Sequence, residues 1–383
     1  MKVLVVPMFA LSPMGGPWSR AQRIASSFLA AGHDVILGFA DDGNCEDPVT
    51  ERTLQLPAPS PLGLPMAIAS RTFPLANKLG IAGRKPVRSF EEVLWLTGAL
   101  AYRYERESVE IIRRFLRNEQ PDVVYSEFNL PAIIASQAER VPCVGTASLP
   151  TRASYACDPE KAGGIRRLLD ELKLPSVTSS LALLDRMKLR FVPSCPALEP
   201  LEGDGIVFCG FLGNPAHAPE SQRDAIVIYM GTGSVPGKAL EESARGLAKT
   251  TGREVFAAGY PGPRRSEGKL HLARRFDFSS LLPRALLFVN HGGQNSVMDA
   301  LAQSTPQAIF PGNVFERQFN AASIVKAEAG IKLSEFSASS LADAVERTAS
   351  DASLREGARR LQAALSSLGG TATIVDRTER LVS

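Results

Sequence analysis

Residues 288–301, Phe-Val-Asn-His-Gly-Gly-Gln-Asn-Ser-Val-Met-Asp-Ala-Leu, carry an apolar run into a segment with helical spacing. The run 286–290 predicts a buried parallel strand, and residues 296–303 predict the helix that follows it. Between them, Gly292 and Gly293 let the backbone come close to a ligand, because glycine has no side chain. A strand that turns over glycines into a helix is the unit from which doubly wound α/β domains are built.

The polar residues of this turn suit a phosphate group. Asn295 and Ser296 are typical helix N-cap residues, and the amides behind them attract an anion. His291 and the Ser296 hydroxyl add hydrogen bonds, and Asp299 lies one turn into the helix, within reach of ribose hydroxyls. A glycine pair alone favours an ordinary turn, but its combination with His291 and Asp299 predicts a nucleoside-diphosphate site.

A second polar segment follows the next strand. Residues 310–321 read Phe-Pro-Gly-Asn-Val-Phe-Glu-Arg-Gln-Phe-Asn-Ala, again a strand end that enters a helix. Since parallel strands end at one edge of a sheet, Glu316 and Arg317 are expected beside the first turn. The Glu316 carboxylate there accepts hydrogen bonds from sugar hydroxyls; taken alone, the two residues fit a solvated helix start.

The same alternation of strands and helices runs through the chain in two halves. In the first half we expect strands at 2–7, 34–40, 121–126 and 141–146, and helices at 19–31, 88–118 and 130–140. In the second half we expect strands at 225–230, 254–259, 286–290 and 307–310, and helices at 238–250, 296–303, 316–328, 338–349 and 351–367. We therefore predict an α/β protein of two Rossmann-like, doubly wound domains that face each other across a cleft.

Proline and glycine accumulate at 193–220, around a short strand at 205–209, as in an interdomain linker. The predicted limits are 1–205 for the first domain and 206–365 for the second, with a helix at 366–383 that packs back on the first. The proline-rich stretch 58–86 is either a flap or a set of short helices.

Composition excludes several classes of protein. The 43 basic and 40 acidic residues leave a net charge of +3, too small for a dedicated nucleic-acid binder. Five scattered cysteines without a C-x-x-C pair fit a reducing compartment and exclude the common zinc spacings. No apolar run reaches the roughly 18 residues of a membrane span, and the N-terminal run is too short for a signal peptide. We expect a cytoplasmic monomer or homodimer.

With these segments in place, the sequence resembles the GT-B glycosyltransferases of the UDP-glycosyltransferase type, in their bacterial natural-product branch. Residues 291–299, His-Gly-Gly-Gln-Asn-Ser-Val-Met-Asp, are similar to the family's donor signature. Pro311, Glu316, Asn320 and Ala321 are similar to the proline, acid, asparagine and alanine that follow it. The resemblance is specific over residues 205–335 and weaker elsewhere.

The resemblance implies that the first domain binds an acceptor and the second binds a nucleotide-sugar as co-substrate, without a further cofactor or a metal. It implies phosphate contacts from His291 and Ser296, a ribose contact from Asp299 and a sugar contact from Glu316. Residues 276–283 correspond to the segment that holds the base. The expected donor-binding residues are Gly231, Thr232, Gly233, Ser234, Phe276, Phe278, His291, Gly293, Asn295, Ser296, Asp299, Glu316 and Arg317.

Two residues depart from the family pattern. Arg317 stands where the family has glutamine and adds a charged, bidentate donor, so we expect an unusual donor sugar or a contact to phosphate. Pro17 stands where many relatives have the histidine general base, a group that typically contributes about 10²–10⁴-fold. Glu127 matches the acid that orients that histidine, and is the candidate catalytic base if burial raises its pKa. The alternatives are a solvated loop glutamate, and an amine or ionised acceptor that needs no strong base.

Gly15, Gly16 and Arg20 are candidates on the acceptor side, although Arg20 also fits an ordinary helix surface. Basic residues at 264, 265, 269, 274 and 275 give either a solvated surface or a weak attraction for anionic lipid, which leaves peripheral membrane contact open.

We expect an inverting, metal-independent glycosyltransferase of the hexosyltransferase type, which moves a sugar from a UDP- or dTDP-sugar to a small hydrophobic acceptor. The alternatives are a GT-B nucleotide-sugar epimerase or hydrolase, and a degenerate, non-catalytic relative that binds an active partner protein.

Overall fold

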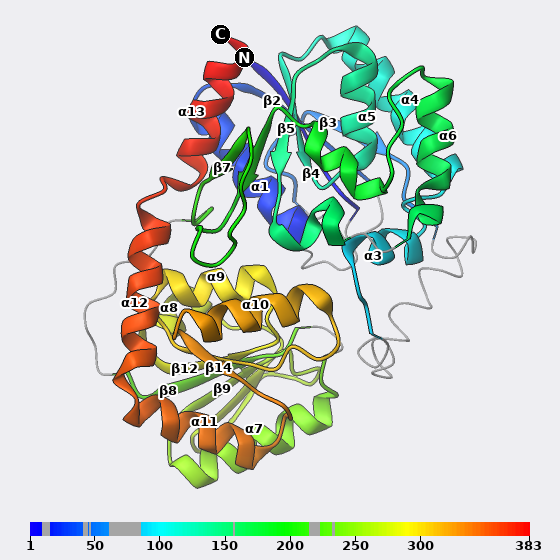
Figure 1. Cartoon of the computed structure of the whole chain (residues 1–383). Coiled ribbons are helices and arrows are strands. Elements are labelled where there is room, and N and C mark those ends of the chain that lie inside the picture. The colour runs from blue at the N-terminus through cyan, green and yellow to red at the C-terminus, as the bar shows by residue number, and fades with distance from the viewer. Residues whose placement is uncertain are drawn as a thin grey trace. The chain divides into compact units, whose positions relative to one another are not determined.

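The computed structural model describes residues 1–9, 16–40, 45, 47–60, 86–155, 158–213, 223–231 and 234–383. The chain folds as two compact units, each built on a seven-stranded sheet (Figure 1). The first unit takes in Met1–Ala69, Ser89–Gly213 and Leu368–Ser383, and the second takes in Ser70–Arg88 and Asn214–Ser367.

The described strands of the first unit form a parallel sheet in the order β3-β2-β1-β4-β5-β6-β7. These strands are β1 (Lys2–Pro7), β2 (Asp34–Ala40), β3 (Thr53–Leu56), β4 (Val123–Glu127), β5 (Cys143–Thr146), β6 (Leu189–Val192) and β7 (Ile206–Phe208). The strand order reverses between β1 and β4, and ligands of doubly wound domains bind at the carboxyl ends of strands at such a switch point.

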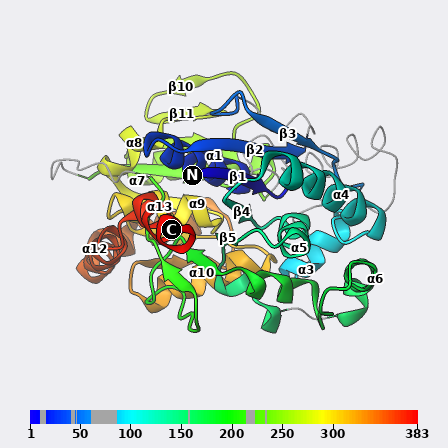
Figure 2. The same cartoon turned by 90° about the horizontal axis from the view of Figure 1, so that it is seen from above.

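Helices cover both faces of this sheet (Figures 1 and 2). On one face, α1 (Gly16–Ala30) and α13 (Gly370–Val382) bury Phe28 and Ile374 against the strands. On the other lie α4 (Tyr102–Glu119) and α5 (Leu130–Glu139), with α6 (Gly163–Glu171) packed on α4. The short helix α3 (Phe90–Leu96) precedes α4.

The structure changes two boundaries that we predicted. β7 pairs with β6, so the strand that we took for part of a linker belongs to the first sheet, and the first unit continues past residue 205 to Gly213. The helix predicted at 88–118 is divided into α3 and α4, because Gly98 between them takes a φ of +79°. A β-carbon at Gly98 would stand 2.1 Å from the Ser60 carbonyl oxygen, so only glycine fits this turn.

The C-terminal helix α13 packs against α1, and Glu379 Oε1 lies 2.8 Å from His33 Nε2. Of the stretch 58–86, only residues 58–60 and 86 lie within the described part of the chain.

The second unit repeats the architecture, with the strand order β10-β11-β9-β8-β12-β13-β14. The strands are β8 (Ala225–Tyr229), β9 (Val255–Ala258), β10 (Arg265–Glu267), β11 (Leu270–Ala273), β12 (Ala285–Asn290), β13 (Gln307–Ile309) and β14 (Gly330–Lys332), and β10 alone among them is antiparallel. The switch point of this sheet lies between β8 and β12.

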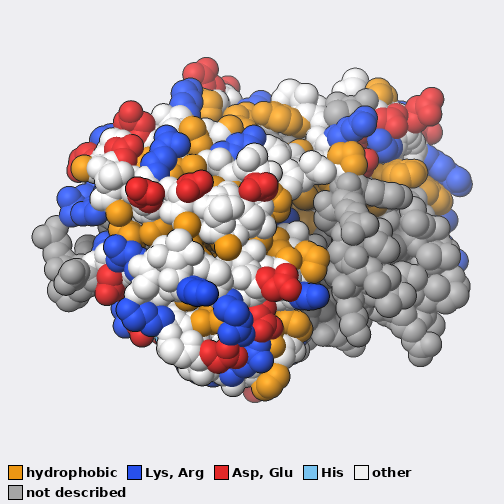
Figure 3. Space-filling model, turned by 90° about the horizontal axis from the view of Figure 1, so that it is seen from below, with side chains coloured by type: hydrophobic (Ala, Val, Ile, Leu, Met, Phe, Trp, Pro, Cys, Tyr) orange, Lys and Arg blue, Asp and Glu red, His pale blue; other side chains and the backbone are white. Residues whose placement is uncertain are grey.

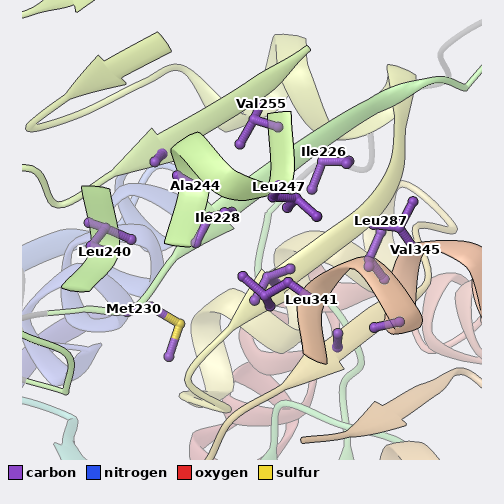
Figure 4. Packing of buried hydrophobic residues seen from close by; sticks show 14 of the residues in the cluster. Ile226, Ile228, Met230, Leu240, Ala244, Leu247, Val255, Leu287, Leu341 and Val345 are labelled. Carbon is purple, nitrogen blue, oxygen red and sulfur yellow. The ribbon is translucent and has the colours of Figure 1, made fainter. Parts of the chain in front are cut away.

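Two helices bury the main core of this unit. Figure 4 shows Leu240 and Leu247 of α7 (Gly237–Thr251) and Leu341 of α11 (Ala338–Ser350) packed over Ile226 and Ile228 of β8. Each such side chain contributes about 1.5–3 kcal/mol by leaving water. The opposite face carries α8 (Phe278–Leu281), α9 (Gln294–Ala302) and α10 (Phe315–Lys326), and α12 (Ala352–Ser366) packs on α9.

Charges of both signs are interspersed on the face of the molecule that Figure 3 shows. Within the basic cluster at 264–275, Arg265 pairs with Glu241 and Glu267, which neutralises part of that cluster. Among the described residues, no helix has the length and the apolar character needed to cross a bilayer.

Candidate functional site

The switch point of the second sheet places His291 between two glycines. His291 follows β12 directly, and its ring packs against Gly231, which follows β8 and Met230. A β-carbon at Gly231 would stand 3.1 Å from the imidazole Cε1, and one at Gly293 would stand 2.6 Å from Nε2. Both positions therefore require glycine for the ring to lie where it does.

Amide side chains hold the turn that contains His291. The Gly292 amide donates to Asn290 Oδ1 at 2.8 Å, and Asn290 Nδ2 donates to Gln307 Oε1 at 3.0 Å. From α10, Asn320 Nδ2 donates to the Gly292 carbonyl at 2.8 Å. Gly292 itself takes a φ of +81°, which favours glycine. The turn is thus fixed by the protein, as a preorganised binding loop requires.

His291 is neutral at physiological pH. Burial and the nearby positive charge of Arg317 lower the pKa of His291 to about 3, against the opposing effect of the Tyr229 backbone carbonyl. Its Nδ1 atom is buried and has no hydrogen-bond partner among the described residues. The Tyr229 ring lies edge-on to the imidazole, with 5.7 Å between the ring centroids. The imidazole therefore carries no charge here.

Helix α9 begins earlier than we predicted. Its N-cap is Gly293, with an extended φ of −66° and ψ of 140°, and the first backbone hydrogen bond runs from Val297 N to Gly293 O at 3.0 Å. Asn295 and Ser296, which we took for N-cap residues, are in the first turn because Gly293 is the last residue outside the helix. Asp299 follows in the same helix and is half-buried.

Arg317 joins the second polar segment to the loop after β8. Its Nη1 atom donates to Ser234 Oγ at 2.7 Å. Burial lowers the pKa of the Arg317 guanidinium and the adjacent Glu316 carboxylate opposes this, so Arg317 remains a cation. Glu316 is half-buried in the first turn of α10. Thr232 and Gly233 lie outside the described residues.

Aromatic side chains extend the site along β8 and α8. The Phe278 ring lies 5.4 Å from that of Tyr229, and the Phe276 ring lies 5.6 Å from that of Phe256. The Arg264 guanidinium stands 5.4 Å from the centroid of the Phe276 ring. Both predicted base-contact residues, Phe276 and Phe278, are half-buried.

At the switch point of the first sheet, two predicted residues form one buried ion pair. Arg20 Nε lies 2.7 Å from Glu127 Oε1, and the two side chains are 8% and 0% exposed. The other carboxylate oxygen accepts a hydrogen bond from the Thr146 hydroxyl. Burial raises the pKa of Glu127, while Arg20 and Thr146 act to lower it.

This pair excludes two of the alternatives that the sequence left open. Arg20 is buried and is no helix-surface residue, and Glu127 is no solvated loop residue. A general base, however, must reach the acceptor, and both carboxylate oxygens of Glu127 are bound to Arg20 and Thr146. The role of Glu127 as catalytic base stays a prediction, and it requires one of these two bonds to break. Gly16 begins α1, and Gly15 lies outside the described residues.

The sequence reasoning missed several residues of the two sites. Asn290 and Gln307 are fully buried amides in apolar strands, and that polarity within an apolar run was a usable signal. Tyr229 and Thr146 are the last residues of β8 and β5, but nothing in the local pattern shows what they contact.

Comparisons with known proteins fit this geometry. Residues 264–381 match the family model described as erythromycin biosynthesis protein CIII-like, C-terminal domain. The zeaxanthin glucosyltransferase of Pseudescherichia vulneris is 28% identical over 230 residues, which cover 55% of this chain and 52% of that protein. The chain thus matches about half the length of this curated relative.

Solved structures match over nearly the whole chain. The spinosyn rhamnosyltransferase SpnG matches with a TM-score of 0.74 at 15% identity, covering 99% of this chain and 100% of that one. The calicheamicin glycosyltransferase CalG4 matches with a TM-score of 0.73 at 17% identity, covering 99% and 97%. At this identity the likeness establishes the fold. The chain is therefore a GT-B fold protein that resembles the natural-product branch of the UDP-glycosyltransferase family.

Proposed function

We propose that this chain is an inverting glycosyltransferase that takes a sugar from a UDP- or dTDP-sugar and transfers it to a small hydrophobic acceptor. One observation carries the proposal. At the switch point of the second sheet, the start of α9, the neutral His291 and the Arg317–Ser234 hydrogen bond come together on a turn that the protein itself holds. Backbone amides, an uncharged imidazole and a cation are suited to a diphosphate.

The diphosphate is the leaving group in this reaction. The acceptor atom forms a bond to the anomeric carbon from one side, while the bond from that carbon to the phosphate oxygen breaks on the other. The electron pair stays on the diphosphate, whose growing charge is stabilised by the N-terminus of α9 and by Arg317 without a metal. His291 donates a hydrogen bond to this group and holds no extra proton to transfer.

The remaining predicted residues are assigned to the other parts of the donor. Asp299 is placed for the ribose, Glu316 for sugar hydroxyls, and Phe276 and Phe278 for the base. Arg317 is tied to Ser234, so its contribution is on the phosphate side of the donor, and the sugar is left to Glu316.

Because Pro17 stands where many relatives have the histidine base, the acceptor must be activated in another way. Breaking one partner of a buried ion pair typically costs about 3–5 kcal/mol, which offsets the gain from using Glu127 as a base. We infer an acceptor that is already ionised, or an amine that passes its proton to solvent once its nitrogen has bonded to the anomeric carbon. The acceptor would be held by the unit whose switch point contains the Arg20–Glu127 pair.

Release of free nucleoside diphosphate, measured with and without acceptor, tests the function. A transferase releases UDP or dTDP only when an acceptor is present and forms a glycoside in equal amount. A hydrolase releases the nucleoside diphosphate without an acceptor, and an epimerase converts the nucleotide-sugar without one. A non-catalytic relative binds the nucleotide-sugar without turnover over a broad acceptor panel.

A further inference from the structure

The second unit contains a short segment from the N-terminal half of the sequence. Val87 forms a parallel bridge with Val314, the residue just before α10. The Val87 amide donates to the Asn313 carbonyl at 3.0 Å, and the Val87 carbonyl accepts from the Phe315 amide at 2.9 Å. Both residues of the bridge are half-buried and belong to the second unit.

This bridge takes the place of a side-chain N-cap, which α10 lacks. A helix leaves its first amides without intrahelical partners, and a polar N-cap side chain usually satisfies one of them. The N-cap of α10 is Val314, whose hydrocarbon side chain makes no such bond. The Val87 carbonyl takes that place for Phe315, the first residue of the helix.

The turn held in this way carries the residues that face the donor. Glu316 and Arg317 follow Phe315 directly in the first turn of α10. On the other side of the segment, Gln318 donates from Nε2 to the Gly312 carbonyl, so the stretch 312–318 is tied to itself as well as to Val87. A loosened start of α10 displaces Glu316 first, because Arg317 has its own tie to Ser234.

We propose that the backbone of Val87 positions the first turn of α10, and with it Glu316, for the sugar of the donor. The inference rests on the proposed function, since it assigns Glu316 to the sugar. It adds a positioning residue that lies far from the donor signature in sequence. The peptide group acts here, so the identity of the side chain at residue 87 matters little.

Two variants separate the peptide group from the side chain. Val87→Pro removes the N–H that binds Asn313, whereas Val87→Ala keeps both peptide groups and trims only the side chain. Calorimetric titration of the full chain compares UDP and dTDP with UDP-glucose and dTDP-glucose. For Val87→Pro we expect the affinity for the nucleotide-sugars to fall about fivefold, the worth of one net hydrogen bond, with UDP and dTDP affinity unchanged. Val87→Ala should match the wild type in all four titrations.

Retained UDP binding in Val87→Pro also shows that the second unit is folded. Amide hydrogen exchange provides a ligand-free measurement. Exchange at Phe315 and Gln318, whose amides bind the carbonyls of Val87 and Val314, should accelerate in Val87→Pro and stay unchanged in Val87→Ala. Equal losses for nucleotides and nucleotide-sugars, an equal effect of the alanine variant, or unchanged exchange would overturn the inference. A wild-type protein that binds none of the four ligands would instead overturn the proposed function.

Discussion

The Arg317 guanidinium donates to the Ser234 hydroxyl at 2.7 Å, which links the start of α10 to the loop after β8. By resemblance, the loop after β8 is expected at the phosphates of a nucleotide-sugar and the start of α10 at its sugar. Arg317 stands where the family pattern has glutamine, so this chain places a guanidinium between the two segments.

Replacing Arg317 by glutamine should weaken the binding of UDP and dTDP by about 10- to 100-fold, because a hydrogen bond to a charged group is worth about 1.5–3 kcal/mol. Calorimetric titration measures the change. Arg360→Gln is the matched control, since it removes the same charge from an exposed pair with Glu328 in the second unit. Unchanged nucleotide affinity and donor preference in Arg317→Gln would show that Arg317 does not contact the phosphates.

Gly293→Ala should abolish nucleotide binding while leaving a folded protein. The new methyl group would stand 2.6 Å from His291 Nε2, so the imidazole must leave its place between the two glycines. Nucleotide binding and far-UV circular dichroism report the two effects separately. Gly163→Ala is the control, because nothing lies within 4 Å of a β-carbon there. Normal UDP affinity in Gly293→Ala would mean that the imidazole position is unimportant for the ligand.

The binding of UDP-glucose should be independent of pH between about 6 and 8. Burial and Arg317 lower the pKa of His291 to about 3, so the ring stays neutral over the range in which a free histidine titrates. A nucleotide-sugar is the right probe, because its diphosphate carries no proton that titrates there. An inflection near pH 6.5 that disappears in His291→Asn would contradict a neutral ring.

Glu127→Gln should destabilise the protein by about 3–5 kcal/mol, because it leaves the Arg20 guanidinium buried without its counter-charge. The double variant Arg20→Met/Glu127→Leu should recover much of that loss, since both buried charges are then gone. Chemical denaturation measures the free energy of unfolding of each. Glu127→Gln with wild-type stability would mean that the ion pair does not hold the first unit together.

Glu105→Gln should stabilise the protein more at pH 8 than at pH 5. Glu105 is 1% exposed on α4, its Oε2 has no hydrogen-bond partner among the described residues, and burial raises its pKa well above the usual value. Because the pKa of Glu105 is higher in the folded than in the unfolded state, the neutral carboxyl stabilises the fold at pH values below the usual pKa of glutamate. This contribution to the free energy of unfolding is lost as the pH rises through the pKa of the folded state. Thermal unfolding measured across pH should show that the difference in melting temperature between Glu105→Gln and the wild type widens as the pH rises. The exposed Glu110→Gln is the control. A difference for Glu105→Gln that stays constant with pH would contradict the prediction.

Local patterns in the sequence were enough to predict that the β12–α9 turn, with its two glycines and His291, follows a strand, and that the segment 310–321 enters a helix after the next strand. The roles of these residues toward a donor come from the family resemblance and stay predictions. Strand and helix periodicity likewise predicted the two doubly wound sheets, because buried strands and amphipathic helices leave different apolar spacings.

What the sequence did not show depends on contacts between distant residues. Arg20 and Glu127 are 107 residues apart, and no local pattern indicates that they pair. The three residues of β7 are too short a run to reveal which sheet they join, which is why the first boundary was placed too early. Val87 is bound beside Val314 through backbone hydrogen bonds, so its residue type does not indicate the contact.

We propose above all that the switch point of the second sheet binds the diphosphate of a nucleotide-sugar. The decisive experiment is titration of the wild-type chain and of Gly293→Ala with UDP and dTDP. We expect one nucleotide to bind per wild-type chain, and no binding to a folded Gly293→Ala chain. Equal binding to both proteins, or binding to neither, would mean that the diphosphate does not bind at this switch point.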